Sequence, residues 1–369
     1  MTGIILTQYN GKIIGPIAKL LGYLMNAIFE FLNMIKIPNI GLSIIIFTIV
    51  IYLLLMPLTI KQQKFSKLSA KMNPELQAIQ KRYKDKKDND SMMAMNAETK
   101  AVYAKYGVSP SGSCLQLLIQ MPILFALYRV IYNMPAYVTR IRDAFGVIAD
   151  SIIASGKVSE IQNLKVAAAY ARNFAIDERN AVIDVLYVMN NKDLAAYATG
   201  HEDVLEQISH FNNFLGINIA NSPSFMISDA WNAEGGPQIL LIPLLSAFTQ
   251  WLNVKLMPQQ AQQDDKNVSD QQASMQQSMK MMNNFMPIMS AVFCFTLPSG
   301  MGLYWIAGSV VRSIQQVVIN KHIDKMNFDD IIKKNSAKSA KKLEKMKEQQ
   351  EKLKDLEAQK TEAENLEIV

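Results

Sequence analysis

The sequence predicts an all-α polytopic membrane protein with five transmembrane helices, an outside N-terminus and an inside C-terminus. Half of the 369 residues are hydrophobic while the mean hydropathy is only +0.06, so apolar residues must be concentrated in some segments. Long runs without a charged residue cover 37–60, 106–128, 235–254 and 281–311. Such runs suit a bilayer core of roughly 30 Å, which about 20 helical residues cross. Lysines after the first run place that side in the cytoplasm.

Residues 1–36 are expected to form an amphipathic helix that lies in the membrane interface. Apolar residues recur at spacings of three and four from Ile13 to Ile35, with Lys19 and Glu30 on the other side. The alternative is an additional spanning helix, which these two charges disfavour. The core of the protein is expected to follow, at residues 37–320.

The first span is placed at about 40–60 and is followed by a cytoplasmic helical hairpin at 61–106. The hairpin carries eleven Lys and Arg against five Asp and Glu, and a positive excess beside a span indicates the cytoplasm. Asn73 and Pro74 have the chemistry of a helix start, with Asn as the cap and Pro at the first position. Residues 84–90 contain no apolar side chain and predict the turn between two antiparallel helices.

The second span is placed at about 109–130, and an extracytoplasmic insertion is expected at 134–234. Residues 131–234 carry seven Lys and Arg against twelve Asp and Glu. Two predicted spans separate this region from the outside N-terminus, so it should also lie outside. The negative balance agrees, although long loops follow the charge rule weakly. Helices are expected at 163–172 and 181–189, and residues 211–220 are assigned to the outer interface.

The third span is placed at about 236–256. The last uncharged run is too long for one span and is divided by Leu297-Pro-Ser-Gly, so two spans are expected at about 283–298 and 301–319. The charged cytoplasmic tail, 321–369, is expected to be a solvated helix or disordered. Its basic half has the charge to contact ribosomal RNA.

No pattern of an enzyme, a metal site or a cofactor site is present in the sequence. His201, His210 and His322 have no Cys or acidic partners at ligand spacing. The predicted spans contain no Asp or Glu, which disfavours an ion- or proton-coupled transporter. Their polar side chains are neutral, and we expect them to hydrogen-bond between helices or to line a wet cavity. They include Thr48, Tyr52, Thr59, Gln120, Thr249, Gln250, Thr296, Ser309 and Gln315.

Five motifs in order give the chain a resemblance to the oxidase-assembly/YidC family of membrane protein insertases, in its Gram-positive-like five-span form. Residues 134–214 and the tail lie outside the resemblance. The motifs are MPLTIKQQ at 56–63, MNPELQAIQKRYK at 72–84, YGVSP at 106–110, CLQLLIQMPILFALY at 114–128, and LPSGMGLYW at 297–305 followed by Gln315 and Gln316.

This resemblance implies a chaperone that inserts and folds nascent membrane proteins through a polar intramembrane groove. The groove would open to the cytoplasm and to lipid, so that a substrate's polar tail avoids most of its desolvation cost. The implied partners are nascent membrane proteins, the lipid bilayer, the ribosome and the Sec translocon, without a small-molecule substrate or a nucleotide. The implied location is the bacterial plasma membrane, with several spans.

The resemblance also implies the groove residues, which are Tyr52, Gln120, Gln250 and Trp305. Gln120 and Gln250 are alternatively helix-packing residues, and Trp305 is alternatively a core aromatic. The family usually has an arginine where this chain has Tyr52. Insertion is therefore expected to depend little on acidic residues in the substrate, unless Arg312 replaces that arginine rather than marking the membrane edge. The alternative function is a non-translocating scaffold for membrane complexes.

Overall fold

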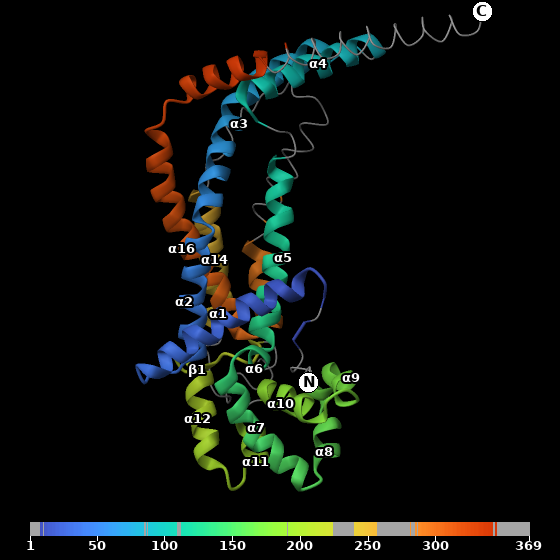
Figure 1. The fold of residues 1–369 in the computed structure, drawn as a ribbon, viewed down its shortest axis with the longest axis vertical. Helices are drawn as coiled ribbons and strands as arrows, with labels where there is room; N and C mark the ends of the chain where they lie inside the picture. The colour runs from blue at the N-terminus through green and yellow to red at the C-terminus, as the bar shows by residue number, and fades with distance from the viewer. Residues whose placement is uncertain are drawn as a thin grey trace, which may run out of the picture. The chain divides into compact units, whose positions relative to one another are not determined.

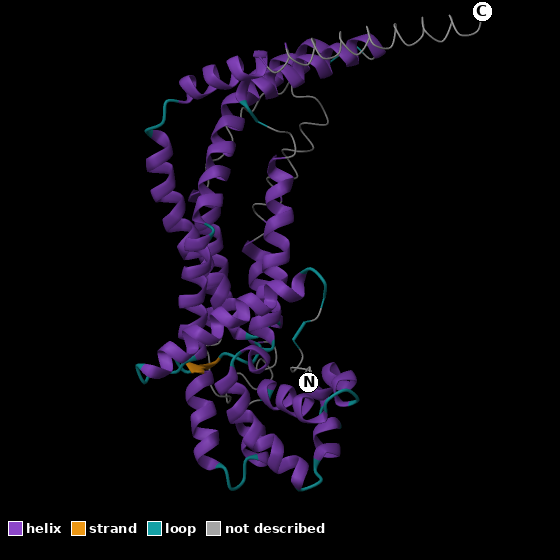
Figure 2. Cartoon of the chain, viewed as in Figure 1, coloured by secondary structure: helices purple, strands orange, loops and turns teal. Residues whose placement is uncertain are grey.

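The computed structural model describes residues 8–9, 11–84, 86, 88–108, 112–189, 191–223, 240–256, 281, 285, 287–341 and 344. The described chain is dominated by helices (Figure 2). The α-helices are α1 (Ile14–Met34), α2 (Ile40–Leu54), α3 (Met56–Tyr83), α4 (Asn89–Tyr106), α5 (Gly112–Tyr132), α6 (Met134–Tyr137), α7 (Thr139–Ala154), α8 (Val158–Gln162), α9 (Ala171–Phe174), α10 (Glu178–Val188), α11 (Asn191–Tyr197), α12 (Glu202–Asn212), α14 (Leu241–Leu256) and α16 (Ser299–Asp324). A 3₁₀-helix, η1, covers Lys165–Tyr170, and further helical residues lie at Pro287–Thr296 and 328–341.

One departure from the predicted all-α class is a short antiparallel hairpin of β1 (Asn213–Phe214) and β2 (Ile217–Asn218). It falls inside the segment that the sequence assigned to the outer interface. Leu215 and Gly216 form its turn, and both have a positive φ, at 52° and 82°. Asn213 Oδ1 accepts a hydrogen bond from the Gly216 backbone N–H at 2.8 Å, which closes the turn. The strand residues are too few to alter the helical architecture.

The chain divides into two compact units. The first unit consists of 1–57, 116–257 and 278–317, and the second consists of 58–115, 258–277 and 318–369. Most of the buried apolar side chains of the first unit belong to one continuous cluster that runs through α1, α2, α5, α7, α10 and α12. The insertion after α5 therefore shares its core with the N-terminal helices and is not a separate domain.

The N-terminal helix α1 packs across α2 and against the insertion (Figure 1). Its buried face includes Met25 and Phe29, and the Phe29 ring meets the edge of Phe211 of α12 at 5.2 Å between centroids. The expected amphipathic helix is present, but Leu20 and Phe31, which the sequence placed on its apolar face, are 68% and 56% exposed. Apolar residues therefore lie on both the buried and the exposed side of α1.

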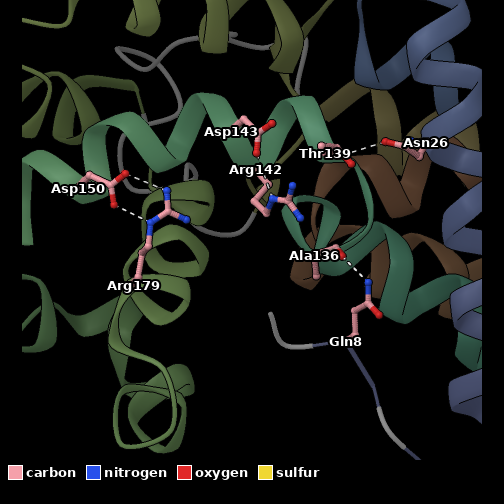
Figure 3. Close-up of polar contacts among 8 residues, drawn as sticks. All are labelled: Gln8, Asn26, Ala136, Thr139, Arg142, Asp143, Asp150 and Arg179. Atoms are coloured by element: carbon pink, nitrogen blue, oxygen red, sulfur yellow. Dashed lines mark hydrogen bonds and ion pairs between the residues drawn. The ribbon is translucent and has the colours of Figure 1, made fainter. Parts of the chain in front are cut away.

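Polar contacts fix the insertion to the N-terminal segment (Figure 3). Asn26 Oδ1 of α1 accepts from the Thr139 backbone N–H at 2.9 Å, and thereby caps the start of α7. Arg179 of α10 forms two hydrogen bonds, of 2.6 and 2.9 Å, with the Asp150 carboxylate of α7. The Arg179 hydrogen bonds hold the pKa of Asp150 below its ordinary value. These contacts orient α7, the central helix of the insertion, against α1 and α10.

A bend of 58° separates α2 from α3. Pro57 explains it, because proline has no N–H for the carbonyl of Leu53 and its ring crowds that carbonyl. Within the described residues, no single helix has both the length and the apolar composition to cross a bilayer, whereas α2 and α3 taken together as a bent pair do. Shorter apolar helices lie at Met121–Tyr132 and Pro287–Thr296.

The second unit contains the α3–α4 hairpin that the sequence predicted. Glu75 of α3 accepts hydrogen bonds from Lys105 Nζ at 2.7 Å and from Tyr106 Oη at 2.8 Å, both from α4. At the other end, Arg82 pairs with Glu98 at 3.0 Å. The expected helix start at Asn73-Pro74 is wrong, because α3 runs without interruption from Met56 to Tyr83. Buried apolar residues before and after Pro74 hold both halves of α3 on one packed face.

Candidate functional site

One cation stands alone in the apolar sequence that forms α16. Arg312 is the single charged residue between Lys280 and Lys321. It lies near the middle of α16, in the first unit, and is partly buried. A charge in such surroundings is costly unless its N–H groups are hydrogen-bonded, so its partners identify the polar centre of this unit.

Three neutral oxygens accept hydrogen bonds from the Arg312 guanidinium. Nη1 donates to Tyr52 Oη of α2 at 2.9 Å, while Nη2 donates to Gln250 Oε1 of α14 at 3.2 Å and to Ser309 Oγ at 3.0 Å. Ser309 Oγ itself donates to Gln250 Oε1 at 2.7 Å. The guanidinium carbon also lies 5.6 Å from the centroid of the Tyr52 ring, at cation–π distance. The cluster therefore joins α2, α14 and α16 through one cation.

Contacts between the end of α2 and α16 position Tyr52 in this cluster. In the last turn of a helix, backbone carbonyls lack an intrahelical partner. The carbonyl of Tyr52 instead accepts a hydrogen bond from Gln315 Nε2 of α16 at 2.8 Å. On the same face of α16, a Cβ at Gly308 would lie 3.1 Å from the Tyr52 ring. The absence of a side chain at Gly308 therefore lets the phenol reach Arg312.

Further neutral contacts continue along α14 on both sides of the cluster. Asn253 Nδ2 donates to Ser313 Oγ at 3.3 Å, and Ser246 Oγ lies 3.1 Å from Ser290 Oγ of the helix at Pro287–Thr296. The Thr249 hydroxyl instead donates a hydrogen bond to a backbone carbonyl of α14 itself. Some polar residues of these helices therefore form the expected interhelical hydrogen bonds, whereas Thr249 bonds within its own helix.

The charge of Arg312 has no ionic partner among the residues that the structure describes. Its bound groups are a phenol, an amide and a hydroxyl, none of which carries a negative charge. The Nε atom is buried and, within the described chain, has no hydrogen-bond partner. An arginine without an ionic partner favours a nearby anion. The arrangement is suited to holding a carboxylate and not to bond-breaking chemistry.

The four residues predicted for the groove do not all meet. Tyr52 and Gln250 come together through Arg312. Trp305 lies elsewhere on α16, where its ring is 6.1 Å from that of Phe293, as in helix–helix packing. Gln120 belongs to α5, but its side chain is outside the described part of the structure. Tyr52, Gln250 and Arg312 therefore define the candidate site, and Gln120 stays a prediction.

Arg312 had a signal in the sequence that its position near a span end obscured. A lone arginine with a serine three residues before it and glutamines three and four residues after it places four polar side chains on neighbouring turns of one helix. Tyr52 and Gln250 were expected in the groove by resemblance, but no pattern along the chain indicated that both would contact Arg312. For metal binding, the described residues contain no group of three His, Cys, Asp or Glu that could hold an ion.

Comparison with protein families shows which family this chain belongs to. A model of the 60Kd inner membrane protein family matches residues 31–326, which include both the candidate site and the hairpin. The chain belongs to this family. Residues 332–369 match a second model, a domain of unknown function.

Curated relatives of this family member are named as insertases. The chain is 27% identical over 307 residues to membrane protein insertase YidC of Fusobacterium nucleatum, covering 82% of this chain and 98% of the relative. It is 27% identical over 281 residues to YidC of Oceanobacillus iheyensis, covering 76% of this chain and 74% of the relative. Membrane protein insertase MisCA of Bacillus subtilis is 43% identical over 98 residues, covering 27% and 37%. The resemblance to YidC-type insertases is thereby confirmed.

Proposed function

We propose that this chain is a membrane protein insertase and chaperone that inserts and folds nascent membrane proteins. Its family and the names of its relatives support this function. The observation that carries the proposal further is the Arg312 cluster, which provides a polar, cationic wall inside helices of apolar composition. A polar substrate segment loses less hydration beside such a wall than in hydrocarbon.

The proposed topology is that of the sequence, with five spans, an outside N-terminus and an inside C-terminus in the bacterial plasma membrane. Large apolar side chains that are exposed on α14 and α16 support a lipid environment, because water would disfavour so many together. Leu244 and Phe248 are 67% and 57% exposed, and Ile314 is 59% exposed. The α3–α4 hairpin would then lie in the cytoplasm, where it would meet substrates. The Sec translocon and the ribosome remain predicted partners.

We assign to Arg312 the charge that the family arginine would supply at position 52. Its guanidinium lies at the Tyr52 phenol, so the positive charge occupies nearly the same place although it comes from α16. Substrates with acidic tails should therefore insert faster than matched neutral ones. This revises the expectation from Tyr52 alone, which was a weak dependence on substrate charge.

The test uses the full chain in liposomes and a single-span substrate with a short tail, in acidic and neutral versions. Protease protection of the tail measures its translocation. Wild-type protein should translocate the acidic tail faster than empty liposomes do. Arg312→Gln should slow this translocation at least about tenfold, the effect expected for loss of a charged contact of about 1.5–3 kcal/mol. Arg312→Lys should retain part of the rate.

The matched control is Lys321→Gln, which removes an exposed positive charge farther along α16. It should leave the rate nearly unchanged. Translocation no faster than in empty liposomes would reject the insertase and leave the non-translocating scaffold. Equal rates for acidic and neutral tails would reject the role of Arg312 while keeping the insertase.

A further inference from the structure

The residues that follow α16 form a second helix start inside the second unit. Asn327 Oδ1 accepts from the backbone N–H of Asp329 at 3.1 Å, and Asn327 Nδ2 donates to Asp330 Oδ2 at 2.9 Å. This is an asparagine cap followed by acidic residues in the first turn, an arrangement that favours the helix at 328–341. A separate helix thus begins a few residues after α16 ends.

Two ion pairs connect this turn to one face of α3. Lys67 pairs with Asp324, and Lys71 Nζ lies 3.3 Å from Asp329 Oδ1. Lys67 and Lys71 are four residues apart and so occupy the same face of α3. Asp324 ends α16, where the helix dipole disfavours a negative charge, so its pairing with Lys67 compensates an unfavourable position.

An aromatic side chain lies beside the second of these ion pairs. Phe328 is only 8% exposed, and Lys71 Nζ is 5.5 Å from the centroid of its ring. A buried phenylalanine gives the contact a position on α3 that exposed charges alone would not define.

The same segment also reaches the end of α4. Asn335 Nδ2 donates to the backbone carbonyl of Tyr106 at 3.0 Å, where the last turn of α4 leaves carbonyls without helical partners. Gly107 follows with φ +65°, and a Cβ there would lie 2.4 Å from Asn335 Nδ2. Residues 324–335 therefore contact both helices of the hairpin.

We propose that residues 324–335, here named the C-terminal latch, hold the α3–α4 hairpin in a docked position and limit its motion. The contacts are suited to reversible docking, since Asp324 and the Lys71–Asp329 pair are exposed and salt screens such charges. Most of the latch lies beyond residue 326, where the family match ends. That the latch thereby slows substrate entry rests on the proposed insertase function; the docking itself does not.

The test is a charge-reversal cycle read by hydrogen exchange on the full chain in detergent. Lys67→Glu and Asp324→Lys should each speed amide exchange in α3 and in 328–341 by about threefold, as expected for an exposed pair in a locally opening segment. The double variant restores opposite charges and should return exchange to the wild-type rate. Lys100→Glu, on an exposed position of α4, is the matched control and should change neither segment.

Two outcomes would overturn the latch: unchanged exchange in both single variants, or a double variant that exchanges as fast as the singles. Phe328→Ala gives an independent measurement and should also speed exchange in α3. The same proteins are then compared in the liposome assay, where the single variants should insert substrate faster than wild type. Absence of insertion in every protein, with the exchange cycle as expected, would reject the insertase and retain the latch.

Discussion

The Arg312 cluster and the α3–α4 hairpin use positive charge in opposite ways. Arg312 is partly buried and hydrogen-bonds only neutral groups among the described residues. The hairpin cations pair with carboxylates, as Lys105 does with Glu75, and both of these side chains are more than a third exposed. Within the described chain Arg312 has no ionic partner, whereas Lys105 and Arg82 of the hairpin already pair with carboxylates.

This difference predicts where each region is sensitive. Electrostatic energies grow as water is excluded, so a change of one charge near Arg312 should have a large effect. Exposed ion pairs contribute little individually and weaken with salt. The cluster is suited to a fixed recognition site, and the hairpin is suited to contacts that form and break.

The largest effect is expected from Tyr52→Arg. This change puts a second guanidinium beside the first, and two like charges about 4 Å apart repel by about 4 kcal/mol at an effective dielectric constant of about 20. Side-chain movement will lower that figure, so we expect about 2–4 kcal/mol of lost unfolding free energy in detergent. Adding Arg312→Gln should recover most of the loss, because a single cation then remains. A single variant as stable as wild type would show that the two positions do not meet.

A smaller loss is expected from Gln250→Met, which keeps the side-chain length but removes the oxygen that accepts from Arg312 and Ser309. Leaving these donors unpaired should cost about 1–3 kcal/mol in the same unfolding measurement. Gln250→Glu is the informative counterpart. It should preserve stability by pairing with Arg312 but slow insertion of acidic tails. The carboxylate introduced at position 250 would then hold the Arg312 guanidinium in place of a substrate carboxylate. Equal insertion by Gln250→Glu and wild type would contradict an anion-binding role.

The smallest effect is expected from Glu75→Gln in the hairpin, at about 0.5–1 kcal/mol for an exposed pair. Energy transfer between dyes at positions 78 and 100, in a cysteine-free background, measures the separation of α3 and α4. A stability difference this small should appear as a partial opening of the hairpin at neutral pH.

The pH dependence of the same hairpin has a defined sign. Burial opposes ionisation of Glu75, but its hydrogen bonds from Lys105 and Tyr106 outweigh this and lower its pKa below 4.5. Its stabilisation is therefore present above pH 4.5 and is lost as the pH falls through the lowered value. Burial and the Glu75 carboxylate raise the pKa of Tyr106 to about 12, so stabilisation present below pH 10 is lost as the pH rises through 12. Glu75→Gln should abolish the acid response, and an unchanged acid response would contradict this assignment.

Several elements were predictable because their causes are local. The α3–α4 hairpin follows from a polar turn between two helical patterns, and the break between Pro287–Thr296 and α16 follows from Leu297-Pro-Ser-Gly. The start at Asn73-Pro74 was predicted wrongly, since packing of α3 overrode a local capping pattern. The β1–β2 hairpin was also missed, because strands of two residues are too short to show an alternating pattern.

By itself, the sequence determined the helical class, the apolar segments, the motifs of the family and the presence of one isolated arginine in α16. These depend on composition and on spacing along one helix. Only the tertiary structure decided that Arg312 meets Tyr52 and Gln250, residues that are 260 and 62 positions away in the chain. Two features hold Tyr52 at α16: the hydrogen bond from Gln315 to the Tyr52 carbonyl, and the lack of a side chain at Gly308. Both act through the packing of α2 on α16, which no pattern within a single segment encodes.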